Sequence, residues 1–370
     1  MSDQTQSTKS INAIHSDMII ALLALLLMAN YYYGVRTLVM AAIAVSTCVL
    51  TDIVCVMMRK KRYKVNDLSA VFTGLVLALL MPATVSFNVL IFSSAFSIIV
   101  GKQVFGGKDN IIFNPAAVGY AFAMLCWSSE ILLFPKPFTT IPIWGEMSES
   151  LNRSLGYSLN MNSIPAIANI DIWLGRFVGP IGATHVIVLI VCAITLMFRR
   201  SISTITFLSG ISTSALIAYL FPRVGASAFK GISLELVSGV LLFGMIFMAS
   251  DPSTMPKTKS GRLWQGILIA IITFAYRHFG NMEHGFIFAL LVANPLSDAL
   301  DNSMSAFARI IKVRFAEFEK HRSAVLGSDK FRDFCVVDEC NIDEYISDDE
   351  DTIITSDEDE VEEEYAKTIQ

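Results

Sequence analysis

The residues best suited to chemistry lie in a polar stretch, residues 136–177, between two long apolar runs. Its segment RSLGYSLN, residues 153–160, carries the hydroxyl groups of Ser154, Tyr157 and Ser158 beside a glycine. Hydroxyl oxygens are the atoms through which Ser, Thr and Tyr take up a covalently attached phosphate. The segment is therefore either an ordinary connector or the attachment point of a cofactor. The elements around it have to decide between the two.

Several other polar residues lie within or beside apolar runs. Asp52 lies inside one, and a carboxylate at membrane depth is a candidate for function. The alternative is an ion pair of Asp52 with Arg59 or with a base of a neighbouring chain, and the sequence does not favour either reading. Glu130 and Glu235 fall near the ends of apolar runs, where we expect solvation at the membrane surface.

Composition places the chain among polytopic membrane proteins. Hydrophobic residues make up 54% of it and charged residues 16%, and its mean hydropathy is +0.56, outside the usual range of soluble domains. Charge is segregated, since residues 326–370 hold 17 acidic and three basic side chains, against 16 and 25 in residues 1–325. Acidic runs with few apolar residues do not fold. We therefore predict a cytoplasmic tail, residues 306–370, disordered from about residue 340, and no nucleic-acid-binding surface.

Ten apolar runs have a length near the ~20 residues that a membrane-crossing helix needs. The predicted fold class is all-α, a polytopic integral membrane protein with about ten transmembrane helices. Its membrane domain covers residues 18–305, after an N-terminal segment of residues 1–17. The predicted spans are 18–34, 36–58, 68–82, 86–101, 113–135, 178–198, 202–221, 231–249, 263–279 and 284–300.

Basic residues gather in the connections after the second, sixth, eighth and tenth predicted spans. They occur at 59–64, 199–200, 257–262 and 312–322. Cytoplasmic loops carry the excess of Lys and Arg, so both termini are predicted to be cytoplasmic and the loop 136–177 to lie outside. Tyr31, Tyr32 and Tyr33 then form an aromatic belt at the outer interface.

Two pairs of segments echo each other. TGLVLALLMP (73–82) and VFGGKDNIIFNPAAVGY (104–120) are similar to SGVLLFGMIFMASDP (238–252) and HFGNMEHGFIFALLVANPL (278–296). Five predicted spans separate the two series, so the series cross the membrane in opposite directions. This predicts two inverted five-helix repeats, an architecture with binding sites between its halves. Chance similarity of apolar sequences is the alternative.

Three residues followed by proline punctuate these segments. Asn114 predicts a helix start, because its side chain can cap free N–H groups and proline fits the first turn. Asp251 similarly predicts the start of a short helix. Asn294 lies inside the tenth predicted span, where the following proline should interrupt the helix.

GGKDNIIFNPAAVGYAF (106–122) and ASDPSTMPKTKSGRLWQG (249–266) resemble signatures of a known family, as does ANPLSDALD (293–301). This is the RnfD/NqrB family, which comprises the D-type membrane subunit of the Rnf ion-translocating electron-transport complex and its relative in the sodium-pumping NADH:quinone reductase. The resemblance covers about residues 18–305. It implies one component of a translocase or oxidoreductase complex, working with the other subunits of an Rnf-type complex. It also implies electron transfer through bound flavin, coupled to Na⁺ or H⁺ translocation.

Members of this family carry FMN in phosphoester linkage to a threonine of the outer loop, and some also bind riboflavin. Here the corresponding motif is imperfect. Aligning its glycine makes Ser158 the acceptor, whereas aligning its leucine places Tyr157 there. Thr184, in the only Gly-Ala-Thr of the chain, is the weaker alternative and fits a helix start better. The absence of covalent flavin is the remaining alternative.

The glycine-rich turn supplies further candidates. By resemblance, Gly106, Gly107 and Asn114 are cofactor-binding residues. Lys102 and residues 108–109 could contact a flavin phosphate or a partner subunit, although a solvated turn is the simpler account. Two other functions stay open: a small-solute channel or transporter, and a redox-inactive structural subunit of the same complex. In each case the resemblance implies a multi-pass protein of a bacterial inner (plasma) membrane.

Overall fold

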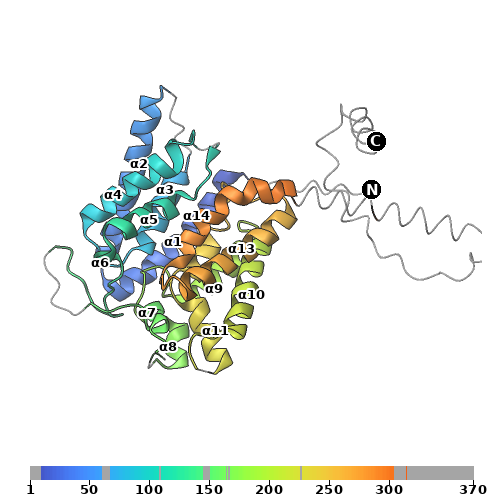
Figure 1. Cartoon of the computed structure of the whole chain (residues 1–370). Helices are drawn as coiled ribbons and strands as arrows, with labels where there is room; N and C mark the ends of the chain where they lie inside the picture. Colours follow the sequence, from blue (N-terminus) through green and yellow to red (C-terminus); the bar gives the residue numbers. More distant parts are fainter. Residues whose placement is uncertain are drawn as a thin grey trace, which may run out of the picture. The chain divides into compact units, whose positions relative to one another are not determined.

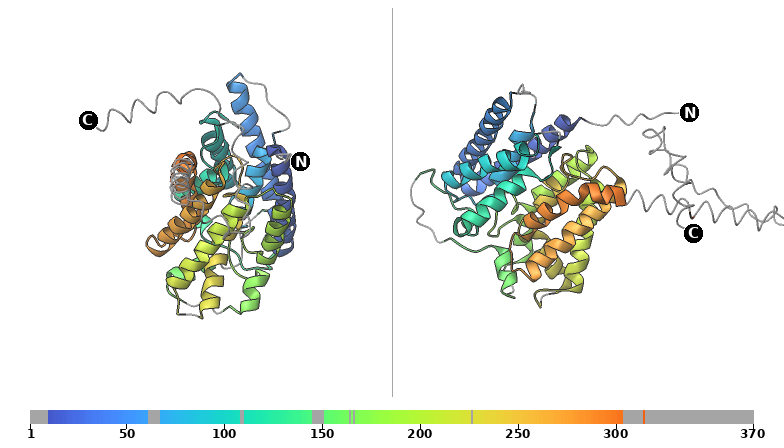
Figure 2. Two further views of the ribbon diagram at one scale, coloured as in Figure 1. Left: turned by 90° about the vertical axis from the view of Figure 1, so that its right-hand side faces the viewer. Right: turned by 45° about the horizontal axis from the view of Figure 1, so that its top comes forward.

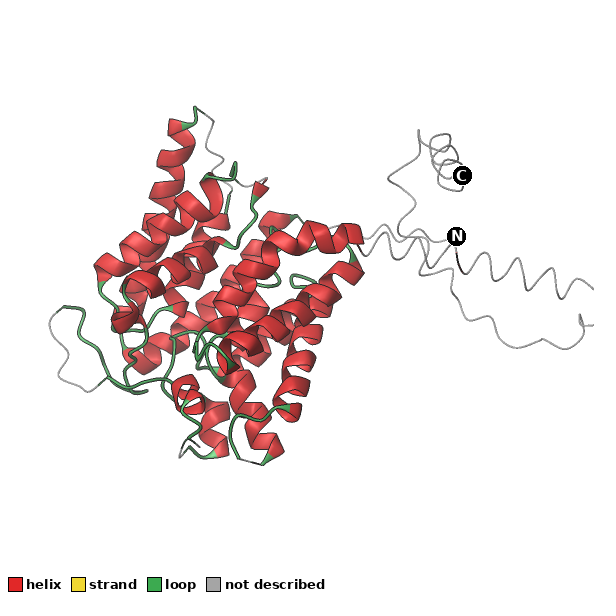
Figure 3. Ribbon diagram, viewed as in Figure 1, coloured by secondary structure: helices red, strands yellow, loops and turns green. Residues whose placement is uncertain are grey.

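The chain is built from helices, and the part that the structure describes contains no strand (Figure 3). This computed structural model describes residues 10–60, 67–107, 110–144, 151–163, 165, 167–225, 227–303 and 314. The all-α prediction is confirmed for these residues. The predicted acidic tail and residues 108–109 lie outside them.

The helices form two groups joined by a loop region. The first group holds α1 (Ile11–Tyr33), α2 (Arg36–Met58), α3 (Ser69–Leu80), α4 (Phe87–Ile98), a π-helix (Ile99–Gln103), α5 (Pro115–Cys126) and α6 (Ser128–Ile131). The loop region holds α7 (Leu155–Asn160) and α8 (Asn169–Leu174). The second group holds α9 (Val186–Phe198), α10 (Thr204–Leu220), α11 (Ala228–Val237), α12 (Leu241–Phe247), α13 (Lys259–His278), α14 (Gly285–Ala293) and a 3₁₀ helix (Asn294–Leu296). Helices α2–α5 lie together, as do α10, α11, α13 and α14 (Figure 1 and the right view of Figure 2).

Polar side chains fix several helix starts. Ser10, Ser203 and Thr258 each accept the backbone N–H three residues further on. Asn114 does the same at 3.2 Å, with proline in the first turn of α5, so the predicted start is confirmed. The cap at Ser10 begins α1 earlier than the predicted span.

The prediction of a short helix at Asp251 is wrong. The Asp251 carboxylate accepts the N–H of Ser253 at 3.0 Å and closes a turn instead, as Asp side chains commonly do before proline-containing loops. The interruption predicted after Asn294 is confirmed, because the chain tightens into a 3₁₀ helix there before continuing as an α-helix to residue 303.

Few of the described helices are long enough to cross a membrane alone. By length and composition α1 and α2 are, and the pair α11–α12, bent by 54° at its break, counts as a third. The other apolar helices are shorter. The predicted span 113–135 is divided at Trp127, and the first residues of 178–198 form a loop before α9.

Two short helices, α3 and α12, occupy the core. Eleven of the twelve residues of α3 and six of the seven of α12 are buried, and a helix that is apolar on all sides belongs inside a protein or a bilayer. The loop before α9 reaches the end of α3, where Gly182 N donates to Leu79 O at 2.7 Å. A Cβ at Gly182 would lie 2.8 Å from Leu79 Cβ and 2.9 Å from the Phe243 ring. The space between α3 and α12 at Gly182 is therefore too small for a side chain.

We expect Gly182→Val to destabilise the fold by about 1–3 kcal/mol, the usual cost of overpacking a dense core. The new side chain would have to displace Leu79 and Phe243 together. The measurement is denaturant unfolding of the purified protein in detergent, with Gly231→Val as the control because nothing lies near that glycine. Equal stability of the two variants would contradict the packing described.

Candidate functional site

A cleft of about 580 Å³ lies within the loop region, and we call it the loop cleft. Its size falls in the range of small-molecule sites, about 300–1,000 Å³. Its lining comes from the segments on both sides of α7 and from the loop before α9. The lining residues are Lys136, Pro137, Phe138, Arg153, Ser154, Leu155, Ser158, Pro165, Ile167, Arg176, Phe177 and Val178.

Short-range contacts hold these segments together. Ser154 caps α7 by accepting Gly156 N at 3.0 Å, and Leu155 N donates to Val178 O at 3.4 Å. Before the helix, Asn152 exchanges two backbone hydrogen bonds of 2.9 Å with Phe134. The segment RSLGYSLN is thus a fixed helical turn and not an extended connector.

The loop cleft combines positive charge with aromatic surface. Lys136, Arg153 and Arg176 line it, and none of the acidic side chains that the structure describes does. The Arg176 guanidinium lies 5.9 Å from the centre of the Phe138 ring, and one of its nitrogens is 3.7 Å from Oδ1 of the partly exposed Asp171. Such a surface suits an anion attached to a flat, partly apolar group.

The structure separates the candidate hydroxyls. Ser158 lines the loop cleft and is partly exposed. Ser154 lines it too, but its oxygen is the cap of α7 and only 2% of the residue is exposed. Tyr157 lies beneath the guanidinium of Arg153, 4.9 Å away. Thr184 is fully buried, with its hydroxyl donating to Ile181 O at 3.4 Å, so it does not face the loop cleft.

The candidates of the glycine-rich turn lie elsewhere. Gly106 and Gly107 follow the π-helix with φ of 120° and 92°, backbone angles that favour glycine. Neither they nor Asn114 line the loop cleft. The Asn114 amide nitrogen donates to Met248 O at 3.4 Å and to Asp251 Oδ2 at 3.3 Å. Asn114 thus joins α5 to the turn after α12, and these contacts require no cofactor.

Lys102 is buried, which corrects the expectation of a solvated turn. Only 2% of it is exposed, and its ammonium group lies 3.0 Å from Asp52 Oδ2, 3.0 Å from Asp67 Oδ2 and 2.8 Å from Ser69 Oγ. Gln103 donates to Asp52 Oδ1 at 2.6 Å. Lys102 and Gln103 both belong to the π-helix, and both side chains contact Asp52 of α2. A π-helical turn holds one more residue than an α-helical turn, so side chains leave it at different angles.

Asp52 thus pairs with Lys102 and not with Arg59, the partner considered from the sequence. Arg59 instead donates to the backbone and side-chain oxygens of Gln103, at 3.3 and 3.1 Å. Lys102 could not be recognised from the sequence as the partner of Asp52, because the two residues are 50 positions apart.

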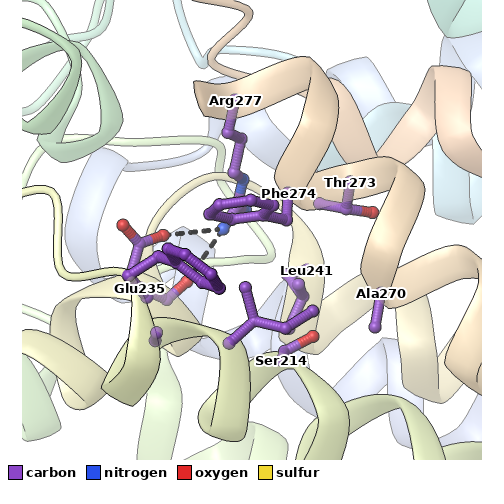
Figure 4. A pocket seen from close by; sticks show the side chains of 10 residues that line it. Ser214, Glu235, Leu241, Ala270, Thr273, Phe274 and Arg277 are labelled. Carbon is purple, nitrogen blue, oxygen red and sulfur yellow. Dashed lines mark hydrogen bonds and ion pairs between the residues drawn. The ribbon is translucent and has the colours of Figure 1, made fainter. Parts of the chain in front are cut away.

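Glu235 is partly buried, with 17% of its side chain exposed, and two arginines reach it where solvation alone was expected. Arg223 pairs with its carboxylate through two nitrogens. Arg277 donates to its carbonyl at 2.9 Å and approaches its carboxylate at 3.4 Å (Figure 4). A cavity of about 20 Å³ adjoins Glu235 and Arg277. Glu130 is exposed, as expected, and accepts Ser86 Oγ at 2.8 Å.

Of the three tyrosines of the predicted aromatic belt, two are buried inside the protein. Tyr31 is 73% exposed, whereas Tyr32 and Tyr33 are 6% and 0% exposed. Consecutive helical residues point in different directions, and α1 turns the second and third inward. Tyr32 OH donates to Leu174 O at 3.1 Å, which ties α1 to the end of α8.

Comparison with known proteins shows which family the chain is similar to. The profile of the NQR2, RnfD, RnfE family matches residues 2–307. The chain belongs to this family. Among similar proteins, the D-type subunit of the ion-translocating oxidoreductase complex of Actinobacillus succinogenes is 26% identical over 76% of this chain and 89% of its own length. The D-type subunit of the Na⁺-translocating ferredoxin:NAD⁺ oxidoreductase complex of Acetobacterium woodii is 29% identical, over 81% of this chain and 91% of its own length.

Proposed function

We propose that this chain is the D-type membrane subunit of an ion-translocating electron-transport complex, and that it carries FMN in the loop cleft. Membership of the NQR2, RnfD, RnfE family over nearly the whole membrane domain supports the first part. The observation that carries the second part is the combination of three bases, two phenylalanines and a serine hydroxyl around one cleft. The partners are the other subunits of the complex and the lipid bilayer.

The residues of the loop cleft fit FMN. Its phosphate needs cationic or N–H donors, which Lys136, Arg153 and Arg176 supply. Its ring system is flat and partly apolar, which Phe138 and Phe177 match. Ser158 is the lining hydroxyl that is partly exposed and is not a helix cap, so it is the residue that can esterify the phosphate.

The protein's task at this site is to hold and orient the cofactor. FMN, when bound, accepts and releases electrons. Arg153 and Arg176 would neutralise the phosphate of bound FMN, and the two phenylalanines would shield its ring from water. The cap at Ser154 fixes the position of Ser158 relative to these groups. A phosphoester or an arginine-bound phosphate would equally keep the ring in the loop cleft.

The same proposal includes ten spans arranged as two inverted halves, in a bacterial inner membrane with cytoplasmic termini. The positions of α3 and α12 support it, since both are short, buried and followed by irregular backbone inside the protein. Discontinuous helices of this kind mark inverted-repeat transporters. Asp17, near the start of α1, pairs with Arg199 at the end of α9 at 2.6 Å, which fits a common cytoplasmic side for both.

Riboflavin is a second cofactor in the proposal, although the contacts of Asn114 do not identify its site. The solute-channel alternative is less well supported, because Gly182 closes the space between α3 and α12. A redox-inactive structural subunit would keep the fold but lose the flavin.

The test is intact and peptide mass spectrometry of the chain, purified from cells that also make its partner subunits and a flavin transferase. We expect an FMN-sized increment on the peptide that contains residues 153–160, and its loss in Ser158→Ala. Tightly bound FMN without a mass increment on this peptide would support the loop cleft as the FMN site but refute the phosphoester at Ser158. A complex that purifies without any flavin would refute the redox role.

A further inference from the structure

Four buried polar side chains meet next to α7. They are Tyr120 of α5, Arg277 of α13, and Glu283 and His284 just before α14, and we call them the Glu283 cluster. Tyr120 and His284 are 0% exposed, Arg277 is 4% and Glu283 is 6%. In the described part of the chain, the Tyr120 hydroxyl, both His284 ring nitrogens, Glu283 Oε1 and Arg277 Nε have no hydrogen-bond partner.

These groups lie near one another without direct hydrogen bonds between them. The Tyr120 and His284 ring centres are 5.6 Å apart, and His284 Nε2 lies 3.9 Å from Glu283 Oε1, too far for a direct hydrogen bond. Arg277 is fixed by donating to the carbonyls of Glu235 and Ser238, as Figure 4 shows for Glu235. Buried polar atoms left without a partner require ordered water or an ion.

Helix α7 connects this cluster to the loop cleft. A Cβ at Gly156 would lie 2.9 Å from Glu283 Cγ, while the preceding residues, Ser154 and Leu155, line the loop cleft. At the other end of α7, Asn160 donates to Asn281 O at 2.8 Å. One helical turn therefore separates the Glu283 carboxyl from the proposed flavin site.

We infer that the Glu283 cluster is a hydrated proton-binding site that exchanges protons with the loop cleft. In the exchange, one proton leaves a water molecule or hydronium ion and bonds to a Glu283 carboxylate oxygen, giving the neutral acid. The reverse step returns it, and no electron moves. The Tyr120 hydroxyl and the His284 ring bind the intervening water. Coupling of this exchange to electron flow rests on the proposed function, but proton binding itself does not.

Burial of Glu283, offset in part by nearby charges, brings its proton exchange to neutral pH. Burial raises the pKa of Glu283 to about 7, and the nearby charges of Arg153 and Arg277 lower it in part. Other titratable groups facing the carboxyl are Tyr120 and His284, with Glu235 beyond Arg277. Because the folded pKa lies above the unfolded value, this group's contribution to stability is present at acid pH and is lost as pH rises through about 7.

Infrared difference spectroscopy of the purified complex, titrated in pH, tests the inference. We expect a protonated-carboxyl band that disappears with a midpoint near pH 7 in the wild type. It should be absent in Glu283→Gln and retained in Glu130→Gln, an exposed carboxyl that serves as the matched control. Tyr120→Phe should move the midpoint to higher pH, because the carboxylate loses a water-mediated donor. That variant removes one oxygen and serves if Glu283→Gln fails to fold.

The same band persisting in Glu283→Gln, or a midpoint that does not move in Tyr120→Phe, would overturn the inference. Flavin content is measured on each sample. Loss of flavin with a normal carboxyl titration would refute the proposed function alone, whereas normal flavin without the titration would refute the proton site alone.

Discussion

Lys102→Met is expected to destabilise the folded chain by about 3–5 kcal/mol, the cost of removing one partner from a buried ion pair. Methionine is similar in length but leaves the carboxylates of Asp52 and Asp67 without their shared cation. Ser69 and Gln103 cannot replace a charge. The measurement is equilibrium unfolding in detergent at neutral pH, followed by near-ultraviolet circular dichroism.

Lys257→Met is the control, because that lysine is exposed and surface substitutions usually change stability by less than ~0.5 kcal/mol. The double variant Lys102→Met with Asp52→Asn should regain part of the loss, since one uncompensated charge is removed. If Lys102→Met unfolds at the same denaturant concentration as the control, the buried pair does not hold α2 to the π-helix.

Asn114→Ala is expected to cost about 2–4 kcal/mol. It removes a helix cap, typically about 1 kcal/mol, and a hydrogen bond to a charged group, about 1.5–3 kcal/mol. The bond joins α5 to Asp251 after α12, so its loss also frees the contact between the two groups of helices. Unfolding in detergent measures the change.

Ser203→Ala separates the two contributions, because Ser203 caps α10 and its other side-chain contact is with a hydroxyl, Thr206 Oγ1, and not with a carboxylate of the described residues. It should cost about 1 kcal/mol. Flavin retention in Asn114→Ala should match that of Ser203→Ala. A selective loss of flavin in Asn114→Ala would show that Asn114 binds the cofactor, as the family resemblance implied, and that its contact with Asp251 is secondary.

Local rules predicted local features well. Asn114 was predicted to start a helix from its side chain and the following proline, and these groups act within one turn. The interruption after Asn294 follows in the same way from a missing N–H. The all-α class followed from the length and number of the apolar runs, which can be read from the sequence without knowing any tertiary contact.

Partners distant in sequence were not predictable in this way. Lys102 and Glu235 were expected in solvent because each lies at the end of an apolar run, yet tertiary contacts bury Lys102 and pair Glu235 with two arginines. Asp17 was assigned to a polar N-terminal segment, although α1 already includes it and Arg199 binds it. The Glu283 cluster is another case, since its members come from three elements and share no motif. The sequence does show a carboxylate next to a histidine, at 283–284, but nothing in it indicates that Tyr120 and Arg277 lie beside them.

The central claim is that the bases of the loop cleft hold a phosphate-bearing flavin. The most direct measurement is the FMN-to-protein ratio of the purified complex in the triple variant Arg153→Gln, Arg176→Gln, Ser158→Ala. The control is Arg200→Gln with Ser158→Ala, because Arg200 is exposed and lies outside the loop cleft. Loss of two charge-assisted bonds, about 1.5–3 kcal/mol each, predicts at least a tenfold fall in FMN retention in the triple variant relative to Ser158→Ala alone, and no change in the control. Full FMN retention in that triple variant would contradict the assignment of the loop cleft as the flavin site.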